Sequence, residues 1–287
     1  MTAPPHASQG RLSVVATPIG NLEDVTLRAL RTLREANVIL AEDTRRTRTL
    51  CAHHGIATPL RAYHAHSAER ERRRCLDELA AGTHVALVTD AGTPLVSDPG
   101  GDLVRAAADL GATVEVIPGP SALTAALSIS AIPFDSFRFV GFAPRSGSRR
   151  RQWLQRIADS DEVVVLFESP ARVARTLTDL AALLDPDREV AACRELTKAH
   201  EEVVRGTAQA LAAHFAAGAR GEFTLVVGAR GEAAQPVATP ESVDAEIARG
   251  IEARLPPSEI ARRVAAATGL SRSEAYRRVR AARGPQA

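Results

Sequence analysis

An apolar run that ends in a cluster of strand-breaking residues limits the choice of fold more than any other stretch of this chain. Residues 84–89 (HVALVT) are apolar and rich in β-branched side chains, which is typical of a strand buried on both faces. The run stops at residues 90–94 (DAGTP), and helical spacing of apolar residues follows Gly101. This order indicates an open α/β sheet, which binds ligands at the carboxyl ends of its strands. An ordinary turn, with Asp98 only capping the helix, is the alternative.

The same alternation of strand and helix recurs along the first half of the chain. The expected elements are strands at 12–16, 38–41 and 113–117 and helices at 24–33, 69–79, 103–110 and 122–129. The spacing of Val25, Leu27, Leu30 and Leu33 predicts that these four side chains of the first helix face the core. Strands that alternate with helices in this way predict a mostly parallel α/β sheet.

The chain changes character near Ile132, where we place the boundary between two α/β domains. Further strands are expected at 138–142, 162–167, 189–193, 201–205 and 223–228, with helices ending at Leu184 and spanning 208–217. Because few residues separate the strands between 189 and 205, hairpin pairing and a mixed sheet are expected. Residues 144–151 (PRSGSRRR) are expected to form an exposed basic loop.

Beyond the second sheet the sequence predicts only helices. The expected parts of the chain are a disordered N-terminal tail (1–11), an N-terminal α/β domain (12–132), a second α/β domain (133–231), a linker (232–239) and a C-terminal basic helical domain (240–287). In the last part, a turn at 269–271 lies between two helices, the second with Ala275, Tyr276 and Val279 on its apolar side. This pattern resembles a helix-turn-helix. A plain helical hairpin with a solvated basic face is the alternative.

Composition and charge restrict the class of protein. From Pro240 onward nine arginines face six acidic residues, a local net charge of +3 in a chain of formal net charge +2. This local excess favours a polyanionic partner. No apolar run approaches the roughly 18–20 residues of a membrane span. Three scattered cysteines without a CxxC pair, and no metal-ligand spacing, predict reduced thiols, no metal site and a cytoplasmic protein.

A single lysine stands among the 36 basic residues, at position 198. Biased coding toward arginine is the alternative explanation. The functional explanation is that position 198 requires a compact amine that is able to lose its proton, which a guanidinium cannot do.

The loops that follow the predicted strands form a set of small, acidic and hydroxyl-bearing residues. They are TPIGN (17–21), EDTRR (42–46), DAGTP (90–94), PGPSA (118–122), FES (167–169) and RELTK (194–198). Neither a P-loop nor a GxGxxG fingerprint is present, and Ser121 has no nucleophile elbow. The set suits a compact polar cofactor that carries an amine, a ribose and an adenine.

Taken together, several long motifs resemble one family. TPIGNLEDVTLRAL, AEDTRRT, LVTDAGTPLVSDPG, PGPSALTAAL and CRELTK are similar to motifs of the bacterial small-subunit ribosomal RNA 2′-O-methyltransferases, which belong to the tetrapyrrole methylase superfamily. The resemblance spans about residues 12–230. It implies a two-domain α/β fold, parallel in the first domain and mixed in the second, that binds S-adenosylmethionine between the domains. It also implies a homodimer that methylates a cytidine ribose in the decoding region of 16S rRNA.

The resemblance places the cofactor against residues from both predicted domains. They are Pro18, Ile19, Asp90, Thr93, Ser121, Ala122 and Phe167. The family carries an aromatic pair before Glu-Ser, whereas Leu166 precedes Phe167 here, so stacking by two adjacent rings is not expected.

Removal of a proton from the ribose hydroxyl needs a base or an orienting group. Lys198 is the candidate, assisted by Glu195, provided that burial or the charge of Arg194 lowers its pKa. A structural ion pair between Lys198 and Glu195 is the alternative. The candidate RNA contacts are Arg45, Arg46, Arg149, Arg150 and Arg277.

Two other functions compete with RNA methylation. One is methylation of a tetrapyrrole carbon by a protein of the same fold. The basic tail and the arginine-rich loop argue against this function. The other is a noncatalytic RNA-binding assembly factor, which would bind RNA with steep salt dependence and show no affinity for the cofactor.

Overall fold

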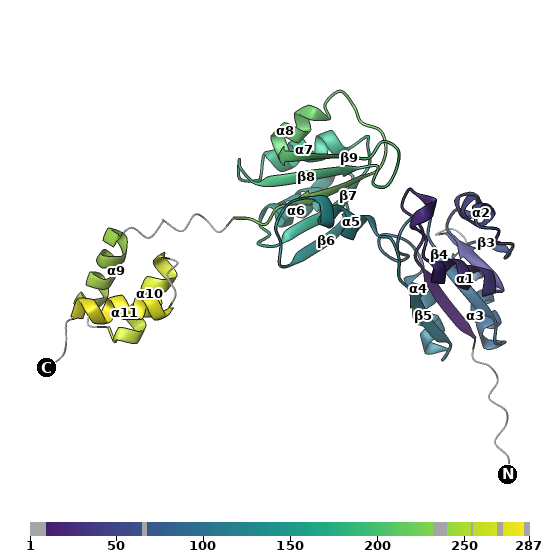
Figure 1. Cartoon of the computed structure of the whole chain (residues 1–287), viewed down its shortest axis with the longest axis horizontal. Helices are drawn as coiled ribbons and strands as arrows, with labels where there is room; N and C mark the ends of the chain where they lie inside the picture. Colours follow the sequence, from purple (N-terminus) through teal and green to yellow (C-terminus); the bar gives the residue numbers. More distant parts are fainter. Residues whose placement is uncertain (1–9, 65–67, 232–239, 254, 269–271, 284–287) are drawn as a thin grey trace, which may run out of the picture. The chain divides into compact units, whose positions relative to one another are not determined.

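The computed structural model describes residues 10–64, 68–231, 240–253, 255–268 and 272–283. These residues form two compact units, one ending at Arg230 and the other beginning at Gly231 (Figure 1). The first unit contains two five-stranded sheets and the second contains helices. Residues 1–9 of the predicted tail, the predicted linker and the predicted turn at 269–271 lie outside the described residues.

The first sheet is entirely parallel, as predicted, with the strand order β3-β2-β4-β1-β5. Its strands are β1 (Arg11–Val15), β2 (Val38–Ala41), β3 (Leu60–Ala62), β4 (His84–Val88) and β5 (Thr113–Ile117). Strand β1 begins within the predicted tail, because Arg11 pairs with both His84 and Thr113. Because neighbouring strands are parallel, the carboxyl ends of β1, β2 and β4 lie along one edge of the sheet.

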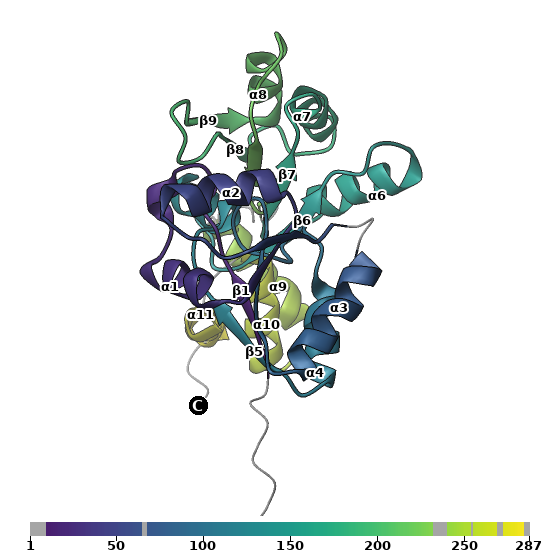
Figure 2. The same ribbon diagram turned by 90° about the vertical axis from the view of Figure 1, so that its right-hand side faces the viewer.

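Helices cover both faces of the first sheet. Helices α1 (Leu27–Glu35) and α2 (Thr44–His53) pack on one face, and α3 (Ala68–Ala80) and α4 (Gly101–Asp109) on the other (Figure 2). Each face has its own apolar core, which is why β2 and most of β4 are apolar rather than alternating.

The helix expected to open at Asp24 starts later than predicted. Leu22–Asp24 form a 3-10 helix (η1), and α1 begins after Thr26, whose Oγ1 accepts a hydrogen bond from the Ala29 amide at 3.1 Å. Leu27 consequently lies in the first turn with 86% of its surface exposed, so the prediction that it faces the core is wrong. The helix starts where the Thr26 side chain caps it, and the spacing of apolar residues gives no indication of such a cap.

The second sheet is mixed, which confirms the prediction, and has the order β6-β7-β10-β8-β9. Its strands are β6 (Phe137–Phe142), β7 (Val163–Glu168), β8 (Glu189–Arg194), β9 (Glu202–Thr207) and β10 (Phe223–Val227). Strands β6 and β7 are parallel, and the other neighbours are antiparallel. Strand β10 therefore begins at the edge where β7 and β8 end.

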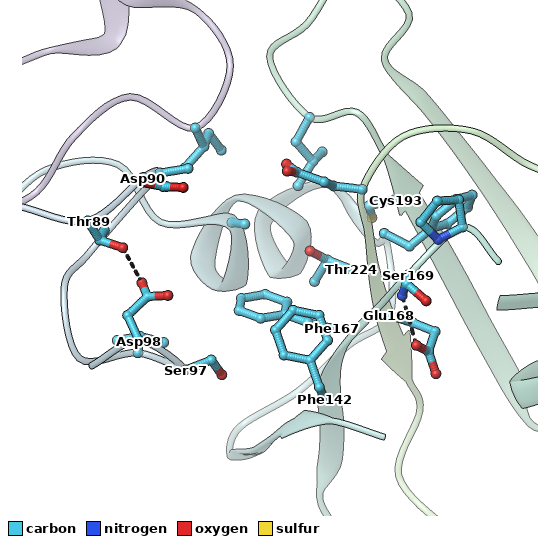
Figure 3. Close-up of a pocket in the computed structure, with 18 of the residues that line it drawn as sticks. Thr89, Asp90, Ser97, Asp98, Phe142, Phe167, Glu168, Ser169, Cys193 and Thr224 are labelled. Carbon is cyan, nitrogen blue, oxygen red and sulfur yellow. Dashed lines mark hydrogen bonds between the residues drawn. The ribbon is translucent and has the colours of Figure 1, made fainter. Parts of the chain in front are cut away.

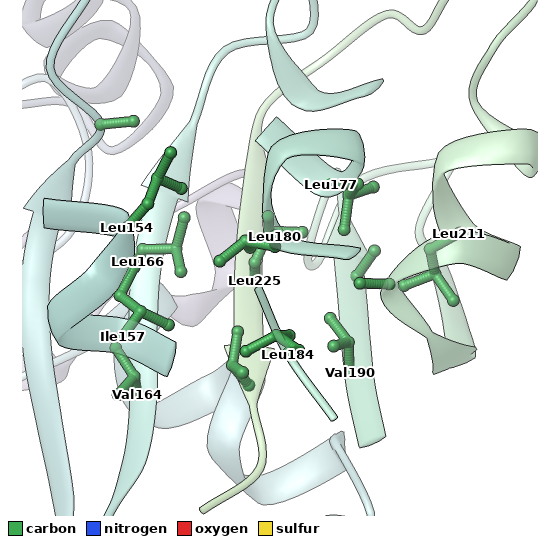
Figure 4. Close-up of a cluster of buried hydrophobic side chains, with 14 of the residues drawn as sticks. Leu154, Ile157, Val164, Leu166, Leu177, Leu180, Leu184, Val190, Leu211 and Leu225 are labelled. Carbon is green, nitrogen blue, oxygen red and sulfur yellow. The ribbon is translucent and has the colours of Figure 1, made fainter. Parts of the chain in front are cut away.

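One face of the second sheet packs against α6 (Gly147–Ala158), α7 (Val173–Ala181) and α8 (Ala208–His214), around a leucine-rich core (Figure 4). The other face is covered by α5 (Ala122–Ile129), which packs on β7 and β10 although the sequence placed it in the first domain. Helix α6 begins inside residues 144–151, which were expected to form a loop.

The second unit consists, in its described residues, of α9 (Pro240–Glu252), α10 (Pro257–Thr268) and α11 (Arg272–Arg283). Its small core contains Val243, Ile247, Ile260, Ala261, Val264, Ala275 and Val279. Tyr276 is 42% exposed and is not part of this core, so its expected place on the apolar side is wrong.

A buried arginine ties the last turn of α6 to the sheet edge. The Arg188 guanidinium is buried and donates to four backbone carbonyls, those of Ile157 (3.0 Å), Ala158 (2.5 Å), Ser160 (3.1 Å) and Gly228 (2.7 Å). These carbonyls include orphan acceptors at the C-terminal end of a helix, which a single cation satisfies.

Replacing Arg188 with Met is expected to lower the free energy of unfolding by about 3 kcal/mol or more, because buried carbonyls lose their donors. Urea denaturation followed by circular dichroism measures the loss. The exposed Arg156 on α6 provides the control, since Arg156→Met should change stability by less than about 0.5 kcal/mol. Equal effects of the two substitutions would contradict the anchoring role of Arg188.

Candidate active site

A pocket of about 420 Å³ lies at the strand ends of both sheets (Figure 3). Its lining includes the residues after β1, β2, β4, β7 and β8, the last residue of β6 and the first residues of β10. Residues from both sheets and their loops line it, among them Ile19, Glu42, Arg46, Thr89, Asp90, Ser97, Asp98, Ala122, Phe142, Phe167, Cys193, Lys198 and Glu222. The pocket falls in the size range of small-molecule sites, about 300–1,000 Å³.

Hydrogen bonds join the loops that carry several of the lining residues. The Thr17 amide donates to the Gly92 carbonyl at 2.9 Å, and the Gly92 amide donates to the Thr17 carbonyl at 3.0 Å. Gly92 has a φ of +81°, and a Cβ there would lie 3.3 Å from Ile19 Cγ2. The Thr93 hydroxyl donates to the Pro120 carbonyl at 3.2 Å, which joins the DAGTP and PGPSA loops.

The structure brings the predicted cofactor residues together, in two layers. Ile19, Asp90, Ala122 and Phe167 line the pocket. Pro18, Thr93 and Ser121 lie next to lining residues in the same loops but are not themselves part of the lining.

Carboxylates from the first sheet form one wall of the pocket. The Thr89 hydroxyl donates to Asp98 Oδ2 at 2.6 Å and lies 3.5 Å from Glu42 Oε2. Burial, followed by the charges of Asp98 and Asp90, raises the pKa of Glu42. Burial and the Asp90 charge also raise the pKa of Asp98, against the hydrogen bond from Thr89. Arg46 Nε lies 3.7 Å from Asp90 Oδ2 and balances part of this charge.

Aromatic rings from the second sheet form the opposite wall (Figure 3). The Phe167 ring lies between two rings of β6, with centroid distances of 4.8 Å to Phe139 and 5.6 Å to Phe142. The second ring that the sequence lacks beside Phe167 is thus supplied by the neighbouring strand.

Lys198 lies in the pocket lining between two carboxylates. Its Nζ donates to Glu195 Oε1 at 2.8 Å and to Glu222 Oε2 at 3.0 Å. Burial is the largest single effect and lowers the pKa of Lys198, but the hydrogen bonds and charges of Glu195 and Glu222 outweigh it, so the pKa is raised. Arg194, expected to lower that pKa, instead pairs with Glu202 at 3.0 Å. The structure therefore contradicts the condition under which Lys198 was expected to act as a base, and it contains the ion pair that was the alternative.

The predicted RNA-binding arginines have different surroundings. Arg45 is exposed and paired with Asp43 at 2.6 Å, and Arg46 lies at the pocket. Arg149 is exposed. Arg277 belongs to α11 of the helical unit, where it contacts Glu274. Arg150 requires a correction, because it is buried.

Arg150 belongs to a buried polar network rather than to a basic surface. Its guanidinium donates to Asp179 Oδ2 at 2.7 Å and to Thr176 Oγ1 at 3.0 Å, and Thr176 in turn donates to Glu168 Oε2 at 2.7 Å. Glu168 also accepts from the Ser169 amide at 2.8 Å and pairs with Arg172 at 2.7 Å. The network fixes the end of β7, from which Phe167 reaches the pocket.

Several lining residues were missed by sequence reasoning. The sequence placed Glu42 only within the EDTRR loop, and it offered Asp98 only as a helix cap. Phe142 and Glu222 carried no signal, because the strand partner of Phe142 and the Glu195 and Lys198 partners of Glu222 lie far away in the sequence. Cys193 is also in the lining, and burial raises its pKa to about 11, so the thiol is neutral at ordinary pH.

In the described part of the chain no group of three or more His, Cys, Asp or Glu side chains is arranged to hold a metal ion. No helix of that part is both long and apolar enough to cross a membrane. The three cysteines are free and buried.

Family comparison agrees with this architecture. The family described as "Tetrapyrrole (Corrin/Porphyrin) Methylases" matches residues 11–212, and the chain belongs to this family of S-adenosylmethionine-dependent methyltransferases. Curated relatives named "Ribosomal RNA small subunit methyltransferase I" are similar to it. The Halalkalibacterium halodurans protein is 48% identical over 79% of this chain and 79% of its own length. The Xylella fastidiosa protein is 42% identical over 94% and 99%.

Solved structures share the fold at lower identity. A cobalt precorrin-4 methyltransferase matches with a TM-score of 0.63 and 19% identity, over 79% of this chain and 98% of that one. A uroporphyrin-III C-methyltransferase from Thermus thermophilus, in complex with S-adenosylhomocysteine, matches with a TM-score of 0.55 and 22% identity, over 76% and 97%.

The pocket fits S-adenosylmethionine by its chemistry. The carboxylate wall complements the positive sulfonium and ammonium groups, and the half-buried ring of Phe167 suits a purine. Gly92 allows the backbone of the DAGTP loop to approach closely.

Gly20 provides a test of how the loops close over this pocket. A Cβ at Gly20 would lie 2.4 Å from Lys198 Cγ and 2.9 Å from the Leu196 carbonyl. Gly20→Ala is therefore expected to push the TPIGN and RELTK loops apart and to raise the Kd for S-adenosylmethionine about tenfold, as measured by calorimetry. Gly101→Ala is the control, since a Cβ there meets no atom within 4 Å. An unchanged Kd for Gly20→Ala would show that the loop contact does not support cofactor binding.

Proposed function

We propose that this chain transfers the methyl group of S-adenosylmethionine to the 2′-hydroxyl of a cytidine ribose in the decoding region of 16S rRNA. The observation that carries the proposal is 42–48% identity, over most of the chain, to relatives named as ribosomal RNA small subunit methyltransferases. The exposed Arg45, Arg46 and Arg149, and Arg277 of the helical unit, suit an RNA partner. We also propose a homodimer that acts in the cytoplasm.

The test is transfer of labelled methyl from S-adenosylmethionine to small ribosomal subunits that lack the modification, with the label mapped by nuclease digestion and mass spectrometry. The expected result is one labelled cytidine ribose in 16S rRNA. Label on a uroporphyrinogen-type macrocycle, and none on the subunit, would replace the proposal with tetrapyrrole methylation.

The residues of the pocket have different roles in the proposed methyl transfer. S-adenosylmethionine, when bound, supplies an electrophilic methyl group. The chain must orient the ribose hydroxyl and accept its proton as the oxygen attacks carbon. Lys198 is held protonated by Glu195 and Glu222, so it cannot accept that proton, but its positive charge favours a developing negative oxygen.

We assign proton acceptance to Glu42. Its carboxylate lies in the pocket lining, and its raised pKa makes it a better base than an ordinary glutamate. Next to Glu42, Thr89 and Asp98 form a hydrogen-bonded pair. Glu195 and Lys198 then act by positioning and by charge.

Glu42→Gln is expected to lower kcat about 100-fold or more at saturating cofactor. Because the base is active only when deprotonated, wild-type kcat should fall as the pH drops through the raised pKa of Glu42, and the variant should lack this acid limb. Glu189→Gln, at an exposed position away from the pocket lining, is the matched control. A variant that keeps both the wild-type rate and the acid limb would exclude Glu42 as the proton acceptor.

A further inference from the structure

The aromatic ring of Phe142 lies in the pocket lining and is exposed to solvent. Phe142 ends β6, lines the pocket and has 52% of its surface exposed. The chain has only ten aromatic residues of the Phe, Trp and Tyr types. A large apolar ring left open to solvent at a pocket is a feature of binding surfaces.

A bulge in β6 turns this ring toward the pocket. Phe139 and Phe142 are three residues apart, so in a regular strand they would face opposite sides of the sheet. The pairing of β6 with β7 shifts register between these two residues, and Gly141 has a φ of +65°. As a result both rings contact Phe167, while Val140 packs on the other face against the leucine-rich core. Bulges re-aim side chains in this way beside functional sites.

Two arginines fix the backbone that follows Phe142. The Arg172 guanidinium donates to the Ala143 carbonyl at 2.9 Å, and the Arg150 guanidinium donates to the Pro144 carbonyl at 3.1 Å. Arg150 is held in turn by Asp179. The ring is therefore presented from a backbone that is anchored before any ligand arrives, which lowers the entropic cost of binding.

The surroundings of Phe142 match a nucleic acid strand. Arg145 and Arg149, three and seven positions further on, are exposed and can contact phosphates. Exposed aromatic rings next to basic side chains are the usual means of binding unpaired nucleotides, because every base has a face that can stack.

The pocket offers two rings, and the cofactor contains one purine. Phe167 is half-buried between Phe139 and Phe142 and belongs to the deeper part of the wall, where we place the adenine. We propose that the base of the methyl-accepting nucleotide, unstacked from its RNA neighbours, stacks on the exposed ring of Phe142. Phe142 is then a substrate-binding residue that holds the ribose hydroxyl at the pocket. This inference rests on the proposed RNA substrate.

The test compares substitutions of Phe142 in the full-length protein. Phe142→Ala is expected to lower kcat/KM for unmodified small subunits about 5- to 150-fold, the loss of one base–ring stack, with the Kd for S-adenosylmethionine unchanged within about twofold. Phe142→Trp should keep kcat/KM within about threefold of wild type, whereas Phe142→Leu, which retains bulk without a π-face, should resemble Phe142→Ala.

Phe137→Ala is the matched control. Phe137 lies on the same strand, is 41% exposed and contacts Phe134, but it is not in the pocket lining. This variant should methylate subunits at the wild-type rate. Thermal unfolding of each variant identifies any loss that comes from misfolding.

Two results would overturn the inference. If Phe142→Ala raises the Kd for S-adenosylmethionine by the factor that it removes from kcat/KM, the ring stacks on adenine instead. If it behaves as Phe137→Ala does, no stacking takes place. Failure of the wild-type protein to methylate any subunit would instead reject the proposed function, which separates the two conclusions.

Discussion

The two backbone hydrogen bonds between Thr17 and Gly92 are the constraint on which the pocket depends. They join the loops that follow β1 and β4, which are neighbours in the parallel sheet, and so they place Ile19 beside the DAGTP loop. From there Gly20 touches the stem of Lys198, which brings the second sheet into the same site. Backbone groups make this connection, so it uses no side chain of either loop.

The elements that follow local rules could be predicted from the sequence, and those that depend on distant partners could not. Strands β2 and β5 and helix α5 have the predicted bounds, because hydrophobic periodicity and flanking breakers define them. The surroundings of Arg150 could not be predicted, since Asp179 and Thr176 come from another helix. Likewise the pKa of Lys198 depends on Glu222, which is 24 positions away in the sequence.

Charge is separated between the inside and the outside of the site. Glu42, Asp90 and Asp98 give the pocket an acidic wall, and Lys198 is matched by two glutamates. Arginines such as Arg45 and Arg149 lie at exposed positions. The acidic wall disfavours a phosphate inside the pocket, which agrees with the proposed entry of a neutral ribose and base.

The bulge at Gly141 has a consequence for how such sites diversify. Because a single extra residue decides which face of the sheet Phe142 occupies, deletion of one position in β6 would send that ring into the leucine-rich core and bring its neighbour to the pocket. Strand register, and not only residue identity, thus determines what a ligand meets. Proteins built on this scaffold can change the chemistry of the pocket wall through one insertion or deletion while the rest of the sheet keeps its pairing.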